Sequence, residues 1–201
     1  MTDQSSHLTP RLYEALELAF KLHGHDSRKG SSVPYMSHVS AVCALVVGDG
    51  GDEDEAIAAL LHDALEDKPK EISRDELFRR FGERVLSIIE SATDTPPEYV
   101  GGPKPPWRQR KETYLLHLRK ADPSMLRVAL PDKIDNARAL LVDHRRIGDD
   151  LWKRFNAEKE DELWYYQSVV ETIKDVGYQG RLLDDLDGLV IQLLRQTRDS
   201  S

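Results

Sequence analysis

The residues best suited to chemistry in this chain are densest at positions 59–67, where apolar side chains surround a His-Asp pair and a Glu-Asp pair. The segment reads Ala-Leu-Leu-His-Asp-Ala-Leu-Glu-Asp. In a helix His62 lies beside Glu66, and Asp63 beside Asp67, because residues four apart share a face. A buried imidazole packed among three carboxylates is unstable unless a cation lies between them. The spacing therefore predicts a metal site.

Two more residues are candidate ligands for the same ion. His62 and Asp63 are adjacent, so on a straight helix they point about 100° apart, and other helices must complete the shell. His38 and Asp132 each lie in an otherwise apolar helical pattern, so we expect both to face inward. Two histidines and two carboxylates with open positions suit Mn²⁺ or another divalent ion such as Fe²⁺ or Zn²⁺.

Such a site is suited to phosphoryl chemistry. A divalent metal lowers the pKa of a bound water and polarises a phosphoryl oxygen. Glu66 is then placed to orient or deprotonate the attacking water, and Asp67 to protonate the leaving oxygen. Two pairs of adjacent cations could hold phosphate charge: Arg28 and Lys29, and Arg110 and Lys111. The residue types alone also fit hydrogen-bonded core histidines and solvated cations, so both interpretations stay open here.

Helical spacing predicts the elements that position these residues. Apolar residues recur three and four apart through most of the chain, and we find neither a period of two nor an internal repeat, so the fold is predicted to be all-α. The segment 94–106 holds five prolines and two glycines, which predicts a loop. Helices are expected over 10–22, 34–47, 52–67, on both sides of a hinge at Gly82, and over 107–120, 126–142 and most of the chain after 150.

Length and composition narrow the class of protein. The 201 residues fit one domain spanning 1–201. A net charge of −8 argues against nucleic-acid binding, and an acidic protein that handles phosphates needs a local basic pocket or a metal. The chain has one cysteine, Cys43, and shows neither a signal peptide nor an apolar run long enough for a membrane span. We therefore expect a cytoplasmic protein without a membrane partner.

Several motifs in order and spacing resemble the HD-domain metal-dependent phosphohydrolases, and most of all the hydrolase domain of the RelA/SpoT alarmone enzymes and the stand-alone small alarmone hydrolases. The resemblance covers residues 9–145, and the helices over 150–201 are expected to complete the domain. The motifs are Ala19-Phe20-Lys21-Leu22-His23, Arg28-Lys29-Gly30, Pro34-Tyr35-Met36-Ser37-His38, the stretch 59–67, Phe81-Gly82, Arg110-Lys111, and 126–138.

The resemblance implies a compact multi-helix HD-domain bundle with one Mn²⁺. It implies hydrolysis of the 3′-pyrophosphate of (p)ppGpp, a small-molecule nucleotide, to GDP or GTP and pyrophosphate. The family's motif positions match His38, His62, Asp63 and Asp132 as metal ligands and Glu66 and Asp67 as catalytic acids. By the same resemblance, Arg28 and Lys29 border the base and Asn136 contacts the nucleoside. The tryptophans and tyrosines after position 150 are expected in the core or at a dimer face, so a homodimer stays possible.

The chain departs from the family pattern on the substrate side. Where the family usually has Ala-Asp-Arg-Leu-His-Asn, this chain has Pro131-Asp132-Lys133-Ile134-Asp135-Asn136, so Asp135 replaces a histidine. Ala139 stands where a threonine is common. Two alternatives therefore remain: a phosphohydrolase for another nucleotide, such as NADPH, a deoxynucleotide or another pyrophosphorylated purine, and a non-catalytic module that binds nucleotide or metal.

Overall fold

Capping residues fix where the first helices begin in the computed structural model, which describes residues 8–94 and 102–198. Helix α1 (Pro10–His23) starts after Thr9, whose side chain accepts a hydrogen bond from the Arg11 amide. Helix α2 (Met36–Gly48) follows a loop. Helix α3 (Glu53–Leu61) starts with a capping box between Asp52 and Glu55. Acidic residues in its first turn also suit the positive end of the helix dipole.

The predicted all-α class is confirmed. Within the described residues there is no strand, only an isolated bridge between Ser27 and Pro34. Of the predicted loop 94–106, residues 95–101 lie outside the described part of the chain. Among the helices described, none is long and apolar enough to cross a membrane. The remaining elements are α4 (Ala64–Asp67), α5 (Arg74–Phe81), α6 (Glu83–Ala92), α7 (Trp107–Leu118), α8 (Pro123–Ile147), the 3₁₀ helix η1 (Gly148–Arg154), α9 (Lys159–Asp175) and α10 (Arg181–Arg198).

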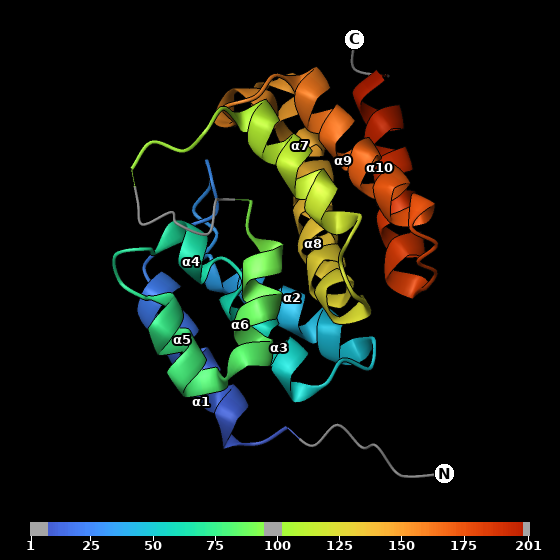
Figure 1. The fold of residues 1–201 in the computed structure, drawn as a ribbon. Coiled ribbons are helices and arrows are strands. Elements are labelled where there is room, and N and C mark those ends of the chain that lie inside the picture. The colour runs from blue at the N-terminus through green and yellow to red at the C-terminus, as the bar shows by residue number, and fades with distance from the viewer. Residues whose placement is uncertain (1–7, 95–101, 199–201) are drawn as a thin grey trace.

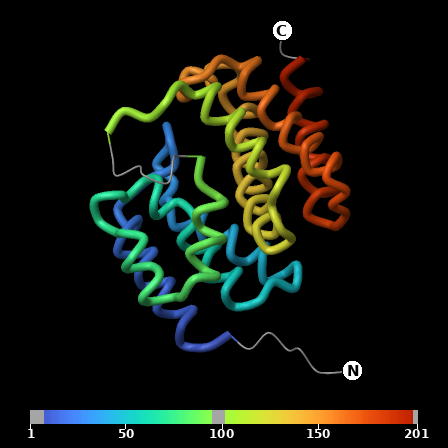
Figure 2. Tube along the Cα trace, viewed as in Figure 1, coloured from blue at the N-terminus to red at the C-terminus, as the bar shows by residue number. Residues whose placement is uncertain are grey.

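Helix α8 lies between two hydrophobic clusters. The first cluster is built by α1 to α6, and the second by α7 to α10 with η1 (Figure 1). The tube in Figure 2 shows the same division, with the blue-to-green part of the chain on one side and the yellow-to-red part on the other. Val128 of α8 belongs to the first cluster, whereas Leu130 and Ile134 belong to the second. Helix α8 is therefore packed against both hydrophobic clusters.

The central stretch is not the continuous helix that its spacing predicts. Helix α3 ends at Leu61, and α4 begins at Ala64. Between them Asp63 adopts φ −93° and ψ −3°, a sparsely populated backbone region in which active-site residues are often found. This break changes the directions of two neighbouring side chains. His62 and Asp63 would diverge on a straight helix, but here both can face one point.

Gly82 separates α5 from α6, as the sequence predicts, and its backbone explains why. Its φ of 90° and ψ of 173° are accessible almost only to glycine. A Cβ placed there meets nothing within 4 Å, so the cost of Gly82→Ala comes from the backbone alone. We expect the variant to lose about 1–3 kcal/mol of unfolding free energy, measured by denaturant titration. Gly188, in the open middle of α10, is the control: Gly188→Ala should gain about 0.5–1 kcal/mol. A Gly82→Ala protein as stable as the wild type would contradict the prediction.

Candidate metal centre and pocket

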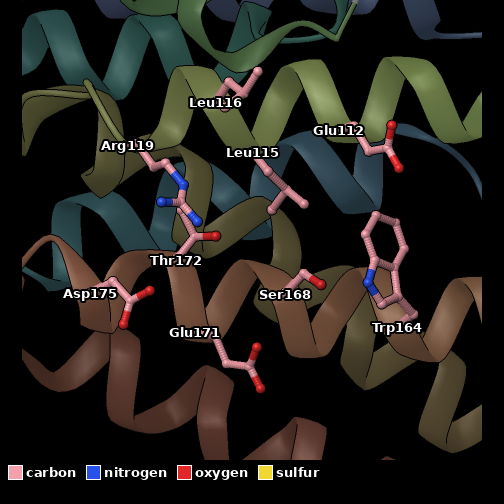
Figure 3. Close-up of a pocket in the computed structure, with 9 residues that line it drawn as sticks. All are labelled: Glu112, Leu115, Leu116, Arg119, Trp164, Ser168, Glu171, Thr172 and Asp175. Atoms are coloured by element: carbon pink, nitrogen blue, oxygen red, sulfur yellow. The ribbon is translucent and has the colours of Figure 1, made fainter.

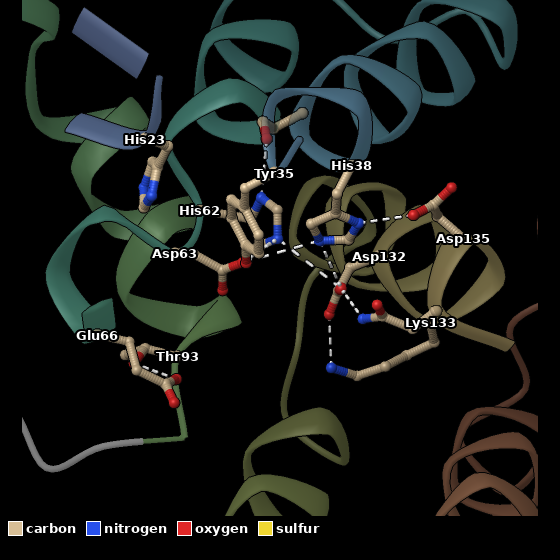
Figure 4. Close-up of polar contacts among 12 residues, drawn as sticks. His23, Tyr35, His38, His62, Asp63, Glu66, Thr93, Asp132, Lys133 and Asp135 are labelled. Carbon is tan, nitrogen blue, oxygen red and sulfur yellow. Dashed lines mark hydrogen bonds and ion pairs between the residues drawn. The ribbon is translucent and has the colours of Figure 1, made fainter. Parts of the chain in front are cut away.

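Four side chains from three regions of the chain meet at one buried point (Figure 4). His38 comes from α2, His62 and Asp63 from the break between α3 and α4, and Asp132 from α8. The ligand atoms of His38, His62 and Asp132 all lie within 4.8 Å of one another. The Asp63 carboxylate lies 3.0 Å from Nε2 of His62 and 3.7 Å from Nε2 of His38. The structure thus groups three of the predicted ligands, His38, His62 and Asp132, and places the Asp63 carboxylate beside the two histidines.

The hydrogen bonds of the two histidine rings leave both Nε2 atoms facing the cluster. Nδ1 of His38 lies 2.7 Å from a carboxylate oxygen of Asp135, and Nδ1 of His62 lies 2.8 Å from the carbonyl oxygen of Ala59. Both partners can only accept, so each Nδ1 carries the hydrogen. In a neutral ring the lone pair is then on Nε2, which is the atom that can bind a metal. Both rings are almost completely buried.

The carboxylates of Asp63 and Asp132 need positive charge beside them to stay ionised at this site. Burial opposes charge on each group, but charged neighbours outweigh it. Lys133 and the two histidines hold the pKa of Asp132 well below its usual value, and His62 lowers the pKa of Asp63. Contacts with Asp132 and Asp63 raise the pKa of His62 above its usual value. Either protons on the rings or a cation can therefore balance the two carboxylates.

One buried nitrogen distinguishes between those two possibilities. Nε2 of His62 is fully buried and makes no hydrogen bond within the described part of the chain, although carboxylate oxygens lie near it. A buried polar atom without a partner is costly. A mixed set of imidazole nitrogens and carboxylate oxygens is a donor set that divalent ions such as Mn²⁺, Fe²⁺ and Zn²⁺ accept. The residues present therefore fit a divalent metal.

The predicted catalytic carboxylates lie at the edge of this cluster. Glu66 is held by Lys104, whose Nζ lies 2.7 Å from its Oε1, and by the Thr93 hydroxyl, which lies 3.3 Å from its Oε2. In Figure 4 its carboxylate lies apart from the four clustered ligands. Asp67 and Glu66 both line a pocket of about 210 Å³ that also contains Asp63 and Asp132. Both are thus near the cluster without belonging to it.

Asp67 should give the metal-free protein an unusual pH dependence of its stability. Partial desolvation in the pocket, and then the charges of Asp63 and Glu66, raise the pKa of Asp67 to about 7. From about pH 4 to pH 7 the folded state keeps a proton that the unfolded state has lost. The contribution of Asp67 to the stability of the fold should therefore decrease as the pH rises through this window and level off above it. The measurement compares thermal unfolding of metal-free wild type and Asp67→Asn across pH. Parallel profiles for the two proteins would refute the prediction.

A larger cavity of about 850 Å³ opens beside the cluster, and its lining is basic although the protein is acidic. Nine Lys and Arg residues line it against five Asp and Glu residues. An acidic protein that handles phosphates needs a local basic pocket or a metal, and this cavity is such a pocket. The nine are Arg28, Lys29, Lys104, Arg110, Lys111, Lys133, Arg138, Arg146 and Arg154.

The two predicted pairs of cations both reach this cavity, and most of their charge is already engaged. Arg110 and Lys111 each form an ion pair with Asp94, and the Lys111 bond is 2.7 Å long. Although burial opposes it, these two cations lower the pKa of Asp94. Lys29 lies over the ring of Phe155, 5.5 Å from its centre. A phosphate at Arg110 and Lys111 would therefore share them with Asp94.

Asn136 and Arg28 connect the cavity to Asp132, one of the predicted metal ligands. The Asn136 amide nitrogen donates to Asp132 at 2.6 Å, and its oxygen accepts from Arg28 at 2.9 Å. Arg28 also donates to Asp135. Both residues line the cavity, where the sequence predicts contacts with the base and the nucleoside. The predicted substrate residues thus lie together, although the nucleotide contacts themselves stay predictions.

Sequence reasoning missed three residues of the site. The Tyr35 hydroxyl donates to Asp63, Lys133 donates to Asp132 at 2.6 Å, and Lys104 holds Glu66. Tyr35 is three residues before His38, so its position on the same face was a usable signal. Lys133 is in a helical pattern that is otherwise apolar, which was a second signal. Lys104 comes from the proline-rich segment, and nothing in its spacing indicated a partner.

A second hollow, on the surface between α7 and α9, contains none of the predicted site residues (Figure 3). It has a volume of about 370 Å³. Its lining mixes apolar side chains with acidic ones and includes no histidine or cysteine. The predicted site residues therefore all lie elsewhere, in and beside the larger cavity. The residues that line the hollow are Glu112, Leu115, Leu116, Arg119, Trp164, Ser168, Glu171, Thr172 and Asp175.

Comparison with known proteins finds similar sequences over most of this chain. The family model described as HD domain matches residues 15–161. A guanosine-3′,5′-bis(diphosphate) 3′-pyrophosphohydrolase of Aquifex aeolicus is 35% identical over 132 residues, which are 65% of this chain and 18% of that protein. The chain thus spans less than a fifth of that relative. The enzyme of the same name from Xenopus tropicalis, MESH1, is 28% identical over 176 residues, covering 86% of this chain and 88% of that protein.

Solved structures show the same fold. One is described as a metazoan ortholog of SpoT that hydrolyzes ppGpp and plays a role in starvation responses. It superposes with a TM-score of 0.72 at 23% identity, and the match covers 94% of this chain and 98% of that one. A Listeria monocytogenes protein superposes with a TM-score of 0.68 at 22% identity, covering 79% and 99%. At these identities the superpositions establish the fold.

Proposed function

This chain belongs to the HD domain family, and from that premise we propose that it is a metal-dependent phosphohydrolase that removes the 3′-pyrophosphate of (p)ppGpp. The observation that carries the proposal is the placement of a buried group of two histidines and an aspartate, which could hold a divalent ion, beside a basic cavity in an acidic protein. The pyrophosphohydrolase names of the Aquifex and Xenopus relatives support the choice of substrate. The Xenopus relative weighs most, because the match spans most of both chains.

His38, His62, Asp63 and Asp132 are the proposed ligands, and Mn²⁺ is the proposed ion. Their fit rests on the unpartnered Nε2 of His62 and on the mixed nitrogen and oxygen donors. A divalent ion there supplies Lewis acidity to a phosphoryl group and makes a water molecule more acidic. Tyr35 and Lys133 each contact one ligand carboxylate and so limit its rotation.

In the proposed reaction a water oxygen attacks the phosphorus that is attached to the 3′-oxygen of the ribose. Glu66 takes a proton from this water, while Lys104 and Thr93 hold its carboxylate in place. The bond from phosphorus to the 3′-oxygen breaks, and Asp67 gives its proton to that oxygen. A pKa of about 7 lets Asp67 carry that proton near neutral pH. The products are GDP or GTP and pyrophosphate.

The cations of the cavity are proposed to bind the rest of the nucleotide. Arg28 and Lys29 are proposed to border the base. The Arg28 guanidinium and the Phe155 ring under Lys29 both line the cavity, and both are groups on which a base can stack. Arg110 and Lys111 are placed to contact the pyrophosphate, in exchange for part of their interaction with Asp94. Location in the cytoplasm and assembly into a homodimer stay predictions, which cell fractionation and light scattering would measure.

Product analysis with a panel of nucleotides tests the proposal. Purified protein is incubated with ppGpp, pppGpp, NADPH and deoxynucleotides, with and without added Mn²⁺, beside the double variant Glu66→Ala/Asp67→Ala. We expect GDP or GTP and pyrophosphate from the wild type only when Mn²⁺ is present. Turnover of NADPH but not of ppGpp would replace the substrate. Equal and undetectable turnover of the whole panel by both proteins would favour a non-catalytic binding module.

A further inference from the structure

Asp135, which stands where the resembled family has a histidine, lies between the metal ligands and the nucleotide cavity. One of its carboxylate oxygens, Oδ2, lies 2.7 Å from Nδ1 of His38 and also accepts from the guanidinium of Arg28. The carboxylate is thus held from two sides.

The residue that accepts a hydrogen bond from His38 is a stronger acceptor than the group that accepts from His62. His62 donates its Nδ1 hydrogen to the backbone carbonyl of Ala59, which is neutral. His38 donates to a carboxylate, which makes its ring a better electron donor at Nε2 and fixes the direction in which the ring points. Nε2 of His38 faces the cluster and lies 3.4 Å from the Asp132 carboxylate.

Arg28 reaches the metal ligands by two routes. One nitrogen of its guanidinium donates to Asp135, which holds His38. The other donates to the oxygen of Asn136, whose amide nitrogen donates to Asp132. Because the guanidinium fork is planar and rigid, the spacing of these two acceptors is set by a single side chain.

We propose that Asp135 is a positioning residue that sets the metal affinity of this protein through His38 and anchors Arg28 in the nucleotide cavity. The inference rests on the metal centre of the proposed function, but it adds a residue that ties nucleotide recognition to ion binding.

The test is metal affinity measured without any nucleotide. Metal-free wild type, Asp135→Asn and Arg28→Gln are titrated with Mn²⁺ against a chromophoric chelator. Asp135→Asn keeps the size of the side chain but removes its charge, and we expect it to weaken Mn²⁺ binding by about 10- to 100-fold. Arg28→Gln removes the other partner of Asp135 and should leave Mn²⁺ affinity close to that of the wild type, while raising the KM for the nucleotide.

Two results would overturn the inference. One is an unchanged Mn²⁺ affinity in Asp135→Asn. The other is an equal loss of affinity in Arg28→Gln, since the carboxylate would then act only by holding the arginine. Asp135→Glu keeps the charge, is expected to lie between Asp135→Asn and the wild type, and replaces Asp135→Asn if that variant does not fold. Because the titration contains no nucleotide, failure of ppGpp hydrolysis would refute the proposed substrate and leave the role of Asp135 standing.

Discussion

Replacing His62 by alanine is expected to abolish metal binding and to destabilise the fold at the same time. The imidazole is fully buried, and its Nε2 faces the cluster while its Nδ1 holds the Ala59 carbonyl. Its removal takes away one ligand and leaves a cavity between α3 and α8. It also removes the stabilisation by the ion, about 2.7 kcal/mol at an ion concentration of 100 times the dissociation constant. Elemental analysis and thermal unfolding with and without Mn²⁺ measure both effects.

His144 supplies the matched control for this experiment. It is another buried histidine of the chain, and it is hydrogen-bonded to Asp149 and Gln196 at the far end of α8. His144→Ala should therefore lower stability while keeping the metal and the rise in melting temperature that the metal causes. A folded His62→Ala protein that retains one Mn²⁺ per chain would contradict the proposed ligand set.

Replacing Glu66 by glutamine is expected to lower kcat by about 10²- to 10⁴-fold while the metal stays bound. Glutamine keeps the size and most of the hydrogen bonding of the side chain, but it cannot take a proton from water. The Glu66 carboxylate is held by Lys104 and Thr93 rather than by either histidine of the cluster, so we do not expect its loss to reduce metal content. Steady-state kinetics with ppGpp and elemental analysis on the same samples give the two readings.

Glu71 is a suitable control, because it lines a hollow next to Glu66 and its side chain is largely exposed. Glu71→Gln should turn over ppGpp at the wild-type rate. If Glu66→Gln also did so with its metal retained, Glu66 would have no role as a base, and another group would have to take the proton.

Local sequence signals predicted the elements of this fold and the identity of the clustered residues. Thr9 followed by proline marks the start of α1, and Gly82 marks the boundary between α5 and α6, because in each case one residue has a strong backbone preference. His38 and Asp132 could be found because a polar residue in an apolar helical pattern usually faces inward.

What sequence spacing did not predict depends on tertiary contacts. The helix break at His62 and Asp63 carries no proline or glycine, so the pattern of apolar residues alone favours a continuous helix. Lys104 meets Glu66 across 38 positions, and Asp135 meets His38 across 97. Such pairs are set by how distant segments of the chain pack, and local spacing contains no information about them.

The position of α8 between the two hydrophobic clusters has a consequence for how this protein opens. Asp132 lies on α8 between Leu130 and Ile134, which belong to the second hydrophobic cluster. His38, His62 and Asp63 lie in or next to α2, α3 and α4, which build the first cluster. An ion held by all four acts as a crosslink between two units that could otherwise come apart separately. With the ion bound, amide hydrogen exchange in α1 and in α10 should slow together, as in one cooperative unit. After chelation, the two helices should exchange at different rates.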